Sequence, residues 1–104
     1  MQLERRGALR SAFGGVAELS AGHPNSYIIG PTADLSRFGC FVATNACVPV
    51  GTEVSLKITY DGGAFHARGE VTYVLVEKGI GIRFAAAAPE DEALLEAWLR
   101  KIST

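Results

Sequence analysis

The feature that most constrains the fold is a pair of alternating segments joined by a tight turn. From residue 54 to residue 60, apolar side chains occupy every second position, which is typical of a β-strand with one buried face. Asp61-Gly62-Gly63 follows and is typical of a hairpin turn. The inward residues expected on the returning strand are Phe65, Ala67, Gly69, Val71, Tyr73 and Leu75. The alternation breaks at Val74 and Val76, which predicts a bulge or burial on both faces there.

Shorter apolar segments on either side of this hairpin predict further strands. They are expected at 16–19, at 27–29, at 38–44 and, after a turn at 77–79, at 80–84. Gly30-Pro31 is expected to end the second of them. Five to seven short antiparallel strands usually avoid open edges by closing into a barrel. The sequence therefore predicts a mainly β fold, built on a small antiparallel β-barrel.

A C-terminal helix is expected over residues 89–102. Pro89 suits the first helical position, acidic residues follow in the first turn, and Arg100 and Lys101 lie at the far end, as the helix dipole favours. The apolar stripe of this helix consists of Leu94, Leu95, Trp98, Leu99 and Ile102. Because the stripe must be buried, we expect the helix to dock on the barrel.

Length and composition predict one domain, residues 1–104, with a flexible arm at 1–13, a barrel at 14–85 and the helix at 89–102. The chain has 104 residues, a hydrophobic fraction of 48% and a formal net charge of −1, which suits one globular core. The near-neutral charge argues against general binding of DNA or RNA, but it allows a local basic cluster for a small anion. No signal peptide or membrane-spanning stretch is evident, so we expect no membrane insertion.

The cysteines and histidines do not predict a metal site or catalysis. Cys40 and Cys47 lack zinc-site spacing, and Cys40 lies in an apolar run, where a buried free thiol is expected. Free thiols suit a reducing cytoplasm. His23 and His66 are far apart in sequence and are expected to be exposed. No set of catalytic side chains can be assembled, so we expect a protein that is not an enzyme and uses no cofactor.

Two polar clusters are candidate binding residues. Residues 5–10 contain Arg-x-x-x-Arg, and residues 34–39 form Asp-x-Ser-x-x-Gly directly before a predicted strand. Alone, the first could be a solvated basic tail. The second could be a turn in which Asp34 and Ser36 bond nearby backbone amides and Gly39 takes a positive φ. For Arg37 and Arg83 the sequence favours solvated side chains over ligand contacts.

Together and in this order, the two clusters resemble the paired motif of the PilZ domain family, whose members are cyclic di-GMP receptors. Arg6 and Arg10 match its first half, and Asp34, Ser36 and Gly39 match its second half. The similarity extends beyond the motif to the strand at 40–42, the closing segment Gly-Ile-Gly-Ile-Arg-Phe at 79–84 and the terminal helix. One departure is Gly-Gly at 14–15, where relatives more often carry a proline and apolar residues, which leaves the path of the arm open.

The resemblance implies a six-stranded barrel of the split, Greek-key type and a cyclic di-GMP site. The residues of that site are Arg5, Arg6, Arg10, Asp34, Ser36 and Gly39. Arginine can pair with phosphate, bond a guanine edge or stack on a base. Asp34 offers the acceptor that the N1 and N2 donors of guanine need, and Ser36 can donate or accept. Gly39 would let the backbone approach the ligand.

The composition of the arm suggests how binding would act. Residues 1–13 carry three like charges and few apolar anchors, only Leu3 and Leu9, so the arm would be mobile without ligand and fold over it, and an unidentified downstream protein partner would respond. The resemblance implies two stacked ligands per chain, because Arg5 lies just ahead of the motif; the alternative is a solvated Arg5 and one ligand. A ligand-independent adaptor, for example in pilus assembly, is the main rival. An oligonucleotide-binding barrel would need exposed aromatics, and the sequence predicts that four aromatics face inward: Phe65, Tyr73, Phe84 and Trp98.

Overall fold

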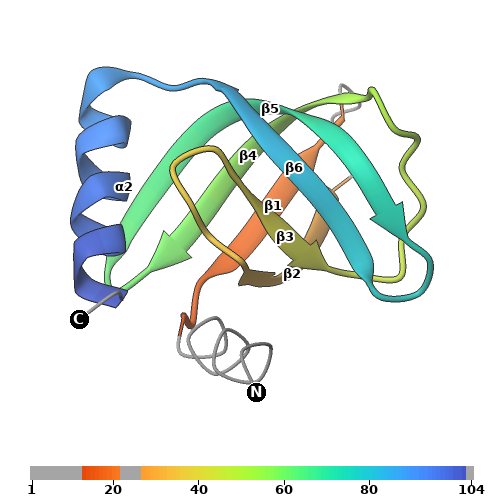
Figure 1. The fold of residues 1–104 in the computed structure, drawn as a ribbon, viewed down its shortest axis with the longest axis horizontal. Coiled ribbons are helices and arrows are strands. Elements are labelled where there is room, and N and C mark those ends of the chain that lie inside the picture. The colour runs from red at the N-terminus through yellow and green to blue at the C-terminus, as the bar shows by residue number, and fades with distance from the viewer. Residues whose placement is uncertain (1–12, 22–26, 103–104) are drawn as a thin grey trace.

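A computed structural model of the chain describes residues 13–21 and 27–102. Along these residues it contains the strands β1 (Val16–Ser20), β2 (Tyr27–Ala33), β3 (Gly39–Ala43), β4 (Glu53–Tyr60), β5 (Gly63–Leu75) and β6 (Gly79–Ala86), and the helix α2 (Pro89–Ile102). Every neighbouring pair of strands is antiparallel, and the strands close into a barrel in the order β1-β2-β3-β6-β5-β4 (Figure 1). The predicted six-stranded antiparallel barrel with a C-terminal helix is therefore confirmed.

The hairpin of β4 and β5 forms as the alternation predicts. The two strands pair in continuous register from Glu53 opposite Glu70 to Tyr60 opposite Gly63. Asp61 and Gly62 both have positive φ, 53° and 81°, which is the geometry of a type I′ turn and matches the twist of the flanking strands. The inward residues that these two strands bury are Val54, Leu56, Ile58, Phe65, Ala67 and Val71. This hairpin therefore supplies a large part of the core.

The predicted bulge exists, but it lies earlier in β5 than expected. The register of β5 against β6 shifts between Val71 and Tyr73, so that one extra residue, Thr72, enters the strand. Because the side-chain period of a strand is two, an extra residue moves all later side chains to the other face. Tyr73 and Leu75 are consequently 45% and 47% exposed, and the expectation that they face inward is wrong. Val74 takes their place and packs against the core.

Strand β2 is longer than the sequence predicts. It continues through Pro31 to Ala33 instead of ending at Gly30-Pro31. The N–H of Thr32 donates to the carbonyl of Gly15 at 2.9 Å, on the β1 side. The nitrogen of Pro31 therefore faces β3, and the pairing of β2 with β3 includes only Thr32 and Ala33. The strand passes through the proline because no ladder hydrogen bond is required at that nitrogen.

Helix α2 stands at the end of the barrel where β4 turns into β5, and it packs chiefly on β5 (Figure 1). Leu95 and Trp98 are buried, and the other predicted stripe residues pack against the core, so the predicted docking is confirmed. Asp61 in the hairpin turn forms an ion pair with Lys101 in the last turn of the helix. Along the described residues, no helix is both long enough and apolar enough to cross a membrane.

Phe13 corrects the expectation for the N-terminal arm. It is the one residue of the expected arm 1–13 that the structure describes, and its side chain is only 5% exposed. Its ring lies 4.5 Å from the ring of Tyr60 and 6.1 Å from that of Trp98, measured between centroids. From the sequence, only Leu3 and Leu9 are expected as apolar anchors of the arm, but Phe13 is buried among these rings. The remaining arm residues, 1–12, lie outside the described residues.

Candidate ligand-binding site

The Asp-x-Ser-x-x-Gly segment forms a compact turn between β2 and β3. The N–H of Ser36 donates to the carbonyl of Gly39 at 2.9 Å. The hydroxyl of Ser36 accepts from the N–H of Phe38 at 3.1 Å and donates to the carbonyl of Gly39 at 3.4 Å. The side chain of Ser36 thus stabilises the turn through hydrogen bonds to its backbone, as expected if the segment is a simple turn. The positive φ lies at Asp34 (54°), a residue type that tolerates the left-handed region, and not at Gly39.

Gly39 is required for a different reason, which is the close approach of two backbones. A Cβ at this position would lie 2.0 Å from the carbonyl oxygen of Ile82 and 3.1 Å from the Cα of Arg83. Gly39 is the register partner of Arg83, and the N–H of Phe84 donates to the carbonyl of Phe38 at 2.8 Å. The glycine therefore brings the motif turn directly alongside β6.

The motif residues share one surface hollow of about 280 Å³ on the outer wall of β3, β6 and β5. Its described lining residues are Asp34, Ser36, Phe38, Gly39, Cys40, Thr72, Tyr73, Ile82 and Arg83. Three of the residues predicted from sequence, Asp34, Ser36 and Gly39, therefore line the same hollow. The other three, Arg5, Arg6 and Arg10, lie outside the described residues. The histidine His23 does so too.

The hollow also contains residues that the sequence analysis did not assign to it. Phe38 is 74% exposed at its edge, and the bulge turns Tyr73 outward into it. The ring of Tyr73 lies across Gly81, where a Cβ would come within 2.1 Å of it, and stacks on Phe41 with centroids 6.2 Å apart. The glycines of β6, Gly79 and Gly81, thus accommodate the rings of Phe41 and Tyr73. The break in alternation near residue 74 was the one sequence signal for this outward turn.

The two arginines near the motif have different surroundings. Arg83 lines the hollow, and its guanidinium lies 2.7 Å from the carboxylate of Glu70 on β5. Arg37, inside the motif, is directed away from the hollow and pairs with Glu96 of α2 at 3.2 Å. Both are exposed, as the sequence favoured, but only Arg83 is positioned to reach a molecule in the hollow.

The floor of the hollow is part of the hydrophobic core. Cys40 is a free, buried cysteine, as predicted, whereas Cys47 is free and exposed. Burial, and to a smaller extent the nearby Asp34 carboxylate, raises the pKa of the Cys40 thiol to about 12. The thiol is therefore neutral near pH 7, whereas the reactive form of a cysteine is the thiolate.

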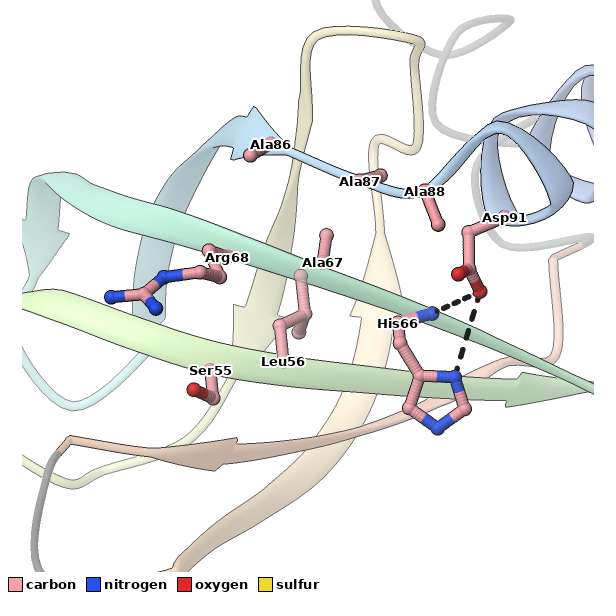
Figure 2. Close-up of a pocket in the computed structure, with 9 residues that line it drawn as sticks. All are labelled: Ser55, Leu56, His66, Ala67, Arg68, Ala86, Ala87, Ala88 and Asp91. Carbon is pink, nitrogen blue, oxygen red and sulfur yellow. Dashed lines mark hydrogen bonds and ion pairs between the residues drawn. The ribbon is translucent and has the colours of Figure 1, made fainter.

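A larger hollow, of about 460 Å³, lies between the outer face of β4 and β5 and the connection from β6 to α2 (Figure 2). Its lining combines four alanines and a leucine with four polar or charged residues. The carboxylate of Asp91 accepts the backbone N–H of His66 at 2.9 Å and lies 3.5 Å from its Nδ1. Ser55 lines the same hollow, but Figure 2 shows its hydroxyl directed away from the imidazole, so these three residues do not form a nucleophile–base pair. Among the described residues, no cluster of three or more His, Cys, Asp or Glu is placed to hold a metal ion.

Comparison with known proteins identifies the family of this barrel. The family model of the PilZ domain matches residues 4–101, and the chain therefore belongs to the PilZ domain family. PilZ domains are binding and adaptor domains, generally receptors for cyclic di-GMP. The crystal structure of the PilZ domain of CeSA from a cellulose-synthesizing bacterium has a similar fold: the TM-score is 0.64 at 19% identity, covering 86% of this chain and 92% of that one. A search of curated proteins gave no match.

Proposed function

We propose that this chain is a receptor for cyclic di-GMP rather than an enzyme, and that it passes the bound signal to a protein partner in the cytoplasm. The observation that carries the proposal is that Asp34, Ser36 and Gly39 line one hollow on the barrel wall. The family match adds weight, because the matched region includes both halves of the family motif. Converging polar groups beside exposed aromatic rings suit a ligand with anionic phosphates and flat bases.

Each part of the ligand has a proposed partner. The carboxylate of Asp34 accepts the N1 and N2 donors of one guanine, which selects guanine over adenine. The exposed rings of Phe38 and Tyr73 offer apolar faces on which a base can stack. Arg6 and Arg10 pair with the phosphates or with the guanine edges, and Arg5 takes part if two ligand molecules bind.

Isothermal titration calorimetry tests this proposal. Cyclic di-GMP should bind, whereas GMP, a short DNA strand and cyclic di-AMP should bind much more weakly or not at all. Arg6→Ala and Arg10→Ala should each reduce affinity about tenfold or more, since a hydrogen bond to a charged group contributes about 1.5–3 kcal/mol. Asp34→Ala should reduce affinity and also narrow the preference for cyclic di-GMP over cyclic di-AMP.

Arg68→Ala is the matched control, because Arg68 is an exposed arginine that lines the other hollow. It should bind like the parent protein. No heat of binding with the parent would argue for a ligand-independent adaptor instead. Equal binding of both cyclic dinucleotides by the parent would remove the role proposed for Asp34. The same titrations give the number of ligands per chain, and two are expected if Arg5 contributes.

A further inference from the structure

Arg83 differs from the motif arginines because the structure describes both its position and its partner. Among the described residues that line the motif hollow it is the only one with a positive charge. It lies on the outer face of β6, opposite Gly39 on β3 and opposite Glu70 on β5. Gly39 has no side chain to stand between Arg83 and the motif turn. The guanidinium therefore has an acid on one side and the hollow on the other.

In the free protein the guanidinium is held by the acid. One nitrogen of Arg83 lies 2.7 Å from a carboxylate oxygen of Glu70, a charge-assisted hydrogen bond of good length. Glu70 itself does not line the hollow. The two side chains are 56% and 38% exposed, so water screens the pair. Such surface pairs contribute little to stability, and an anion that offers the arginine a second contact can displace the carboxylate.

We propose that Arg83 exchanges Glu70 for a phosphate of the bound cyclic dinucleotide, and that Glu70 is a competing internal anion that lowers affinity. The inference rests on the proposed function, and it adds a residue that the paired motif does not include. A phosphodiester can accept two hydrogen bonds from the planar guanidinium, as a carboxylate does, so the exchange replaces one good partner with another. The net contribution of Arg83 to the binding free energy is therefore the difference between its interaction with the phosphate and its interaction with Glu70.

The barrel contains a matched pair that serves as a control. Arg37 and Glu96 also form an exposed arginine–glutamate pair, with a nitrogen–oxygen distance of 3.2 Å and exposures of 62% and 40%. Neither residue lines the motif hollow. Substitutions in this pair change the net charge of the protein by the same amount as those at Arg83 and Glu70. They therefore control for any general effect of charge on the binding of an anion.

The experiment is a double-mutant cycle measured by calorimetry with cyclic di-GMP at constant ionic strength. Arg83→Gln should lower affinity about tenfold, as loss of a charge-assisted hydrogen bond implies. Glu70→Gln should raise affinity about two- to fivefold, because the competing pair of at most about 1 kcal/mol is gone. In the double variant, Glu70→Gln should have no further effect, because the arginine for which Glu70 competes is absent. Arg37→Gln and Glu96→Gln should bind like the parent.

Three outcomes would overturn the exchange. Binding by Arg83→Gln that equals the parent would show that Arg83 does not contact the ligand. Reduced affinity in Glu70→Gln would show that Glu70 positions Arg83 and does not compete for it. An equal gain from Glu70→Gln with and without Arg83 would show simple repulsion of the anion. In each of these cases the parent still binds and the proposed function stands, whereas a parent without binding overturns the function and the exchange together.

Discussion

The hollow beside the motif turn and the hollow beneath the β6–α2 connection lie on one barrel, and the second is the larger, at about 460 Å³ against about 280 Å³. Their linings differ in kind. The smaller one gathers a carboxylate, hydroxyl groups, two exposed aromatic rings and an arginine. The larger one also has a carboxylate, a hydroxyl and an arginine, but four alanines stand where the smaller one has aromatic rings, and its carboxylate, Asp91, already accepts the backbone N–H of His66 (Figure 2). Recognition of a polar ligand depends on converging polar groups, so the site that we propose is the smaller hollow and not the one that volume alone would favour.

The two hollows also arise from different irregularities at the same strand pair. Near one end of the pair, the bulge at Thr72 turns Tyr73 outward and completes the wall of the motif hollow. Near the other end, the pairing of β5 with β6 stops at Arg68 opposite Ala86, and the chain leaves the sheet towards α2. The first irregularity places an aromatic ring in the hollow that we propose as the ligand site. The second leaves space that Asp91 of the helix partly closes by bonding the N–H of His66.

The largest expected effect is a difference in protein stability between substitutions under helix α2 and substitutions in the motif hollow. Trp98 is buried beneath α2 against the rings of Phe13, Tyr60 and Phe65. Trp98→Ala should lower the free energy of unfolding by about 3–5 kcal/mol, as is usual when a large buried aromatic side chain is removed. Phe38→Ala should change stability by less than about 0.5 kcal/mol, because the ring is exposed. Urea denaturation measures both.

For ligand affinity, the substitution of Phe38 should have the larger effect and the substitution of Trp98 the smaller one. Phe38→Ala should weaken binding of cyclic di-GMP by about 1 kcal/mol or more if a base stacks on the ring. Trp98→Leu, which keeps apolar bulk, should remain folded and bind like the parent. The comparison fails if Phe38→Ala is the less stable protein, or if loss of the Trp98 ring weakens binding in a protein that is still folded.

Much of the fold could be predicted from local patterns, because each pattern acts within one element. The alternation of residues 54–60, the Asp-Gly-Gly turn and the apolar stripe of α2 require no knowledge of distant residues. The predictions that were wrong concern relations between strands. The extra residue at Thr72 is defined only against β6, and the extension of β2 past Pro31 depends on where its pairing with β3 begins. The burial of Phe13 likewise depends on Tyr60 and Trp98, which are distant in sequence.

The site could be predicted in part, for the same reason. Asp34, Ser36 and Gly39 occur in one short segment, so the motif alone could locate them. Tyr73 and Arg83 come from other strands, and only the register of β3, β6 and β5 brings them to the hollow. The expectation of a positive φ at Gly39 was also wrong. The residue must be a glycine because the carbonyl of Ile82, on a neighbouring strand, lies where a Cβ would be. Local sequence gave no sign of that contact.

A smaller effect, on the pH dependence of stability, should come from Cys40 in the floor of the motif hollow. The folded state holds the pKa of Cys40 at about 12, against an ordinary value of 9.0. Between these pH values the unfolded chain has released the thiol proton and the folded chain has not, so stability should fall as pH rises, by at most about 1.4 kcal/mol per pH unit. In Cys40→Ala this contribution should be absent, so its stability should decline less steeply above pH 9.0 than that of the parent. Equal slopes would mean that the thiol is accessible to water from the hollow.

The smallest expected effect is the change in the free energy of unfolding on substitution of Asp91, the acidic residue of the larger hollow. Asp91 bonds the backbone N–H of His66 at 2.9 Å and lies in the first turn of α2, where the helix dipole favours its charge. Asp91→Ala should therefore lower the free energy of unfolding by about 1 kcal/mol, and Asp91→Asn should lower it less because the amide oxygen can still accept that hydrogen bond. Neither should change the affinity for cyclic di-GMP, whereas Asp34→Ala should reduce it. If Asp91→Ala weakened binding as strongly as Asp34→Ala, the ligand would occupy the larger hollow, and the distinction drawn between the two hollows would be wrong.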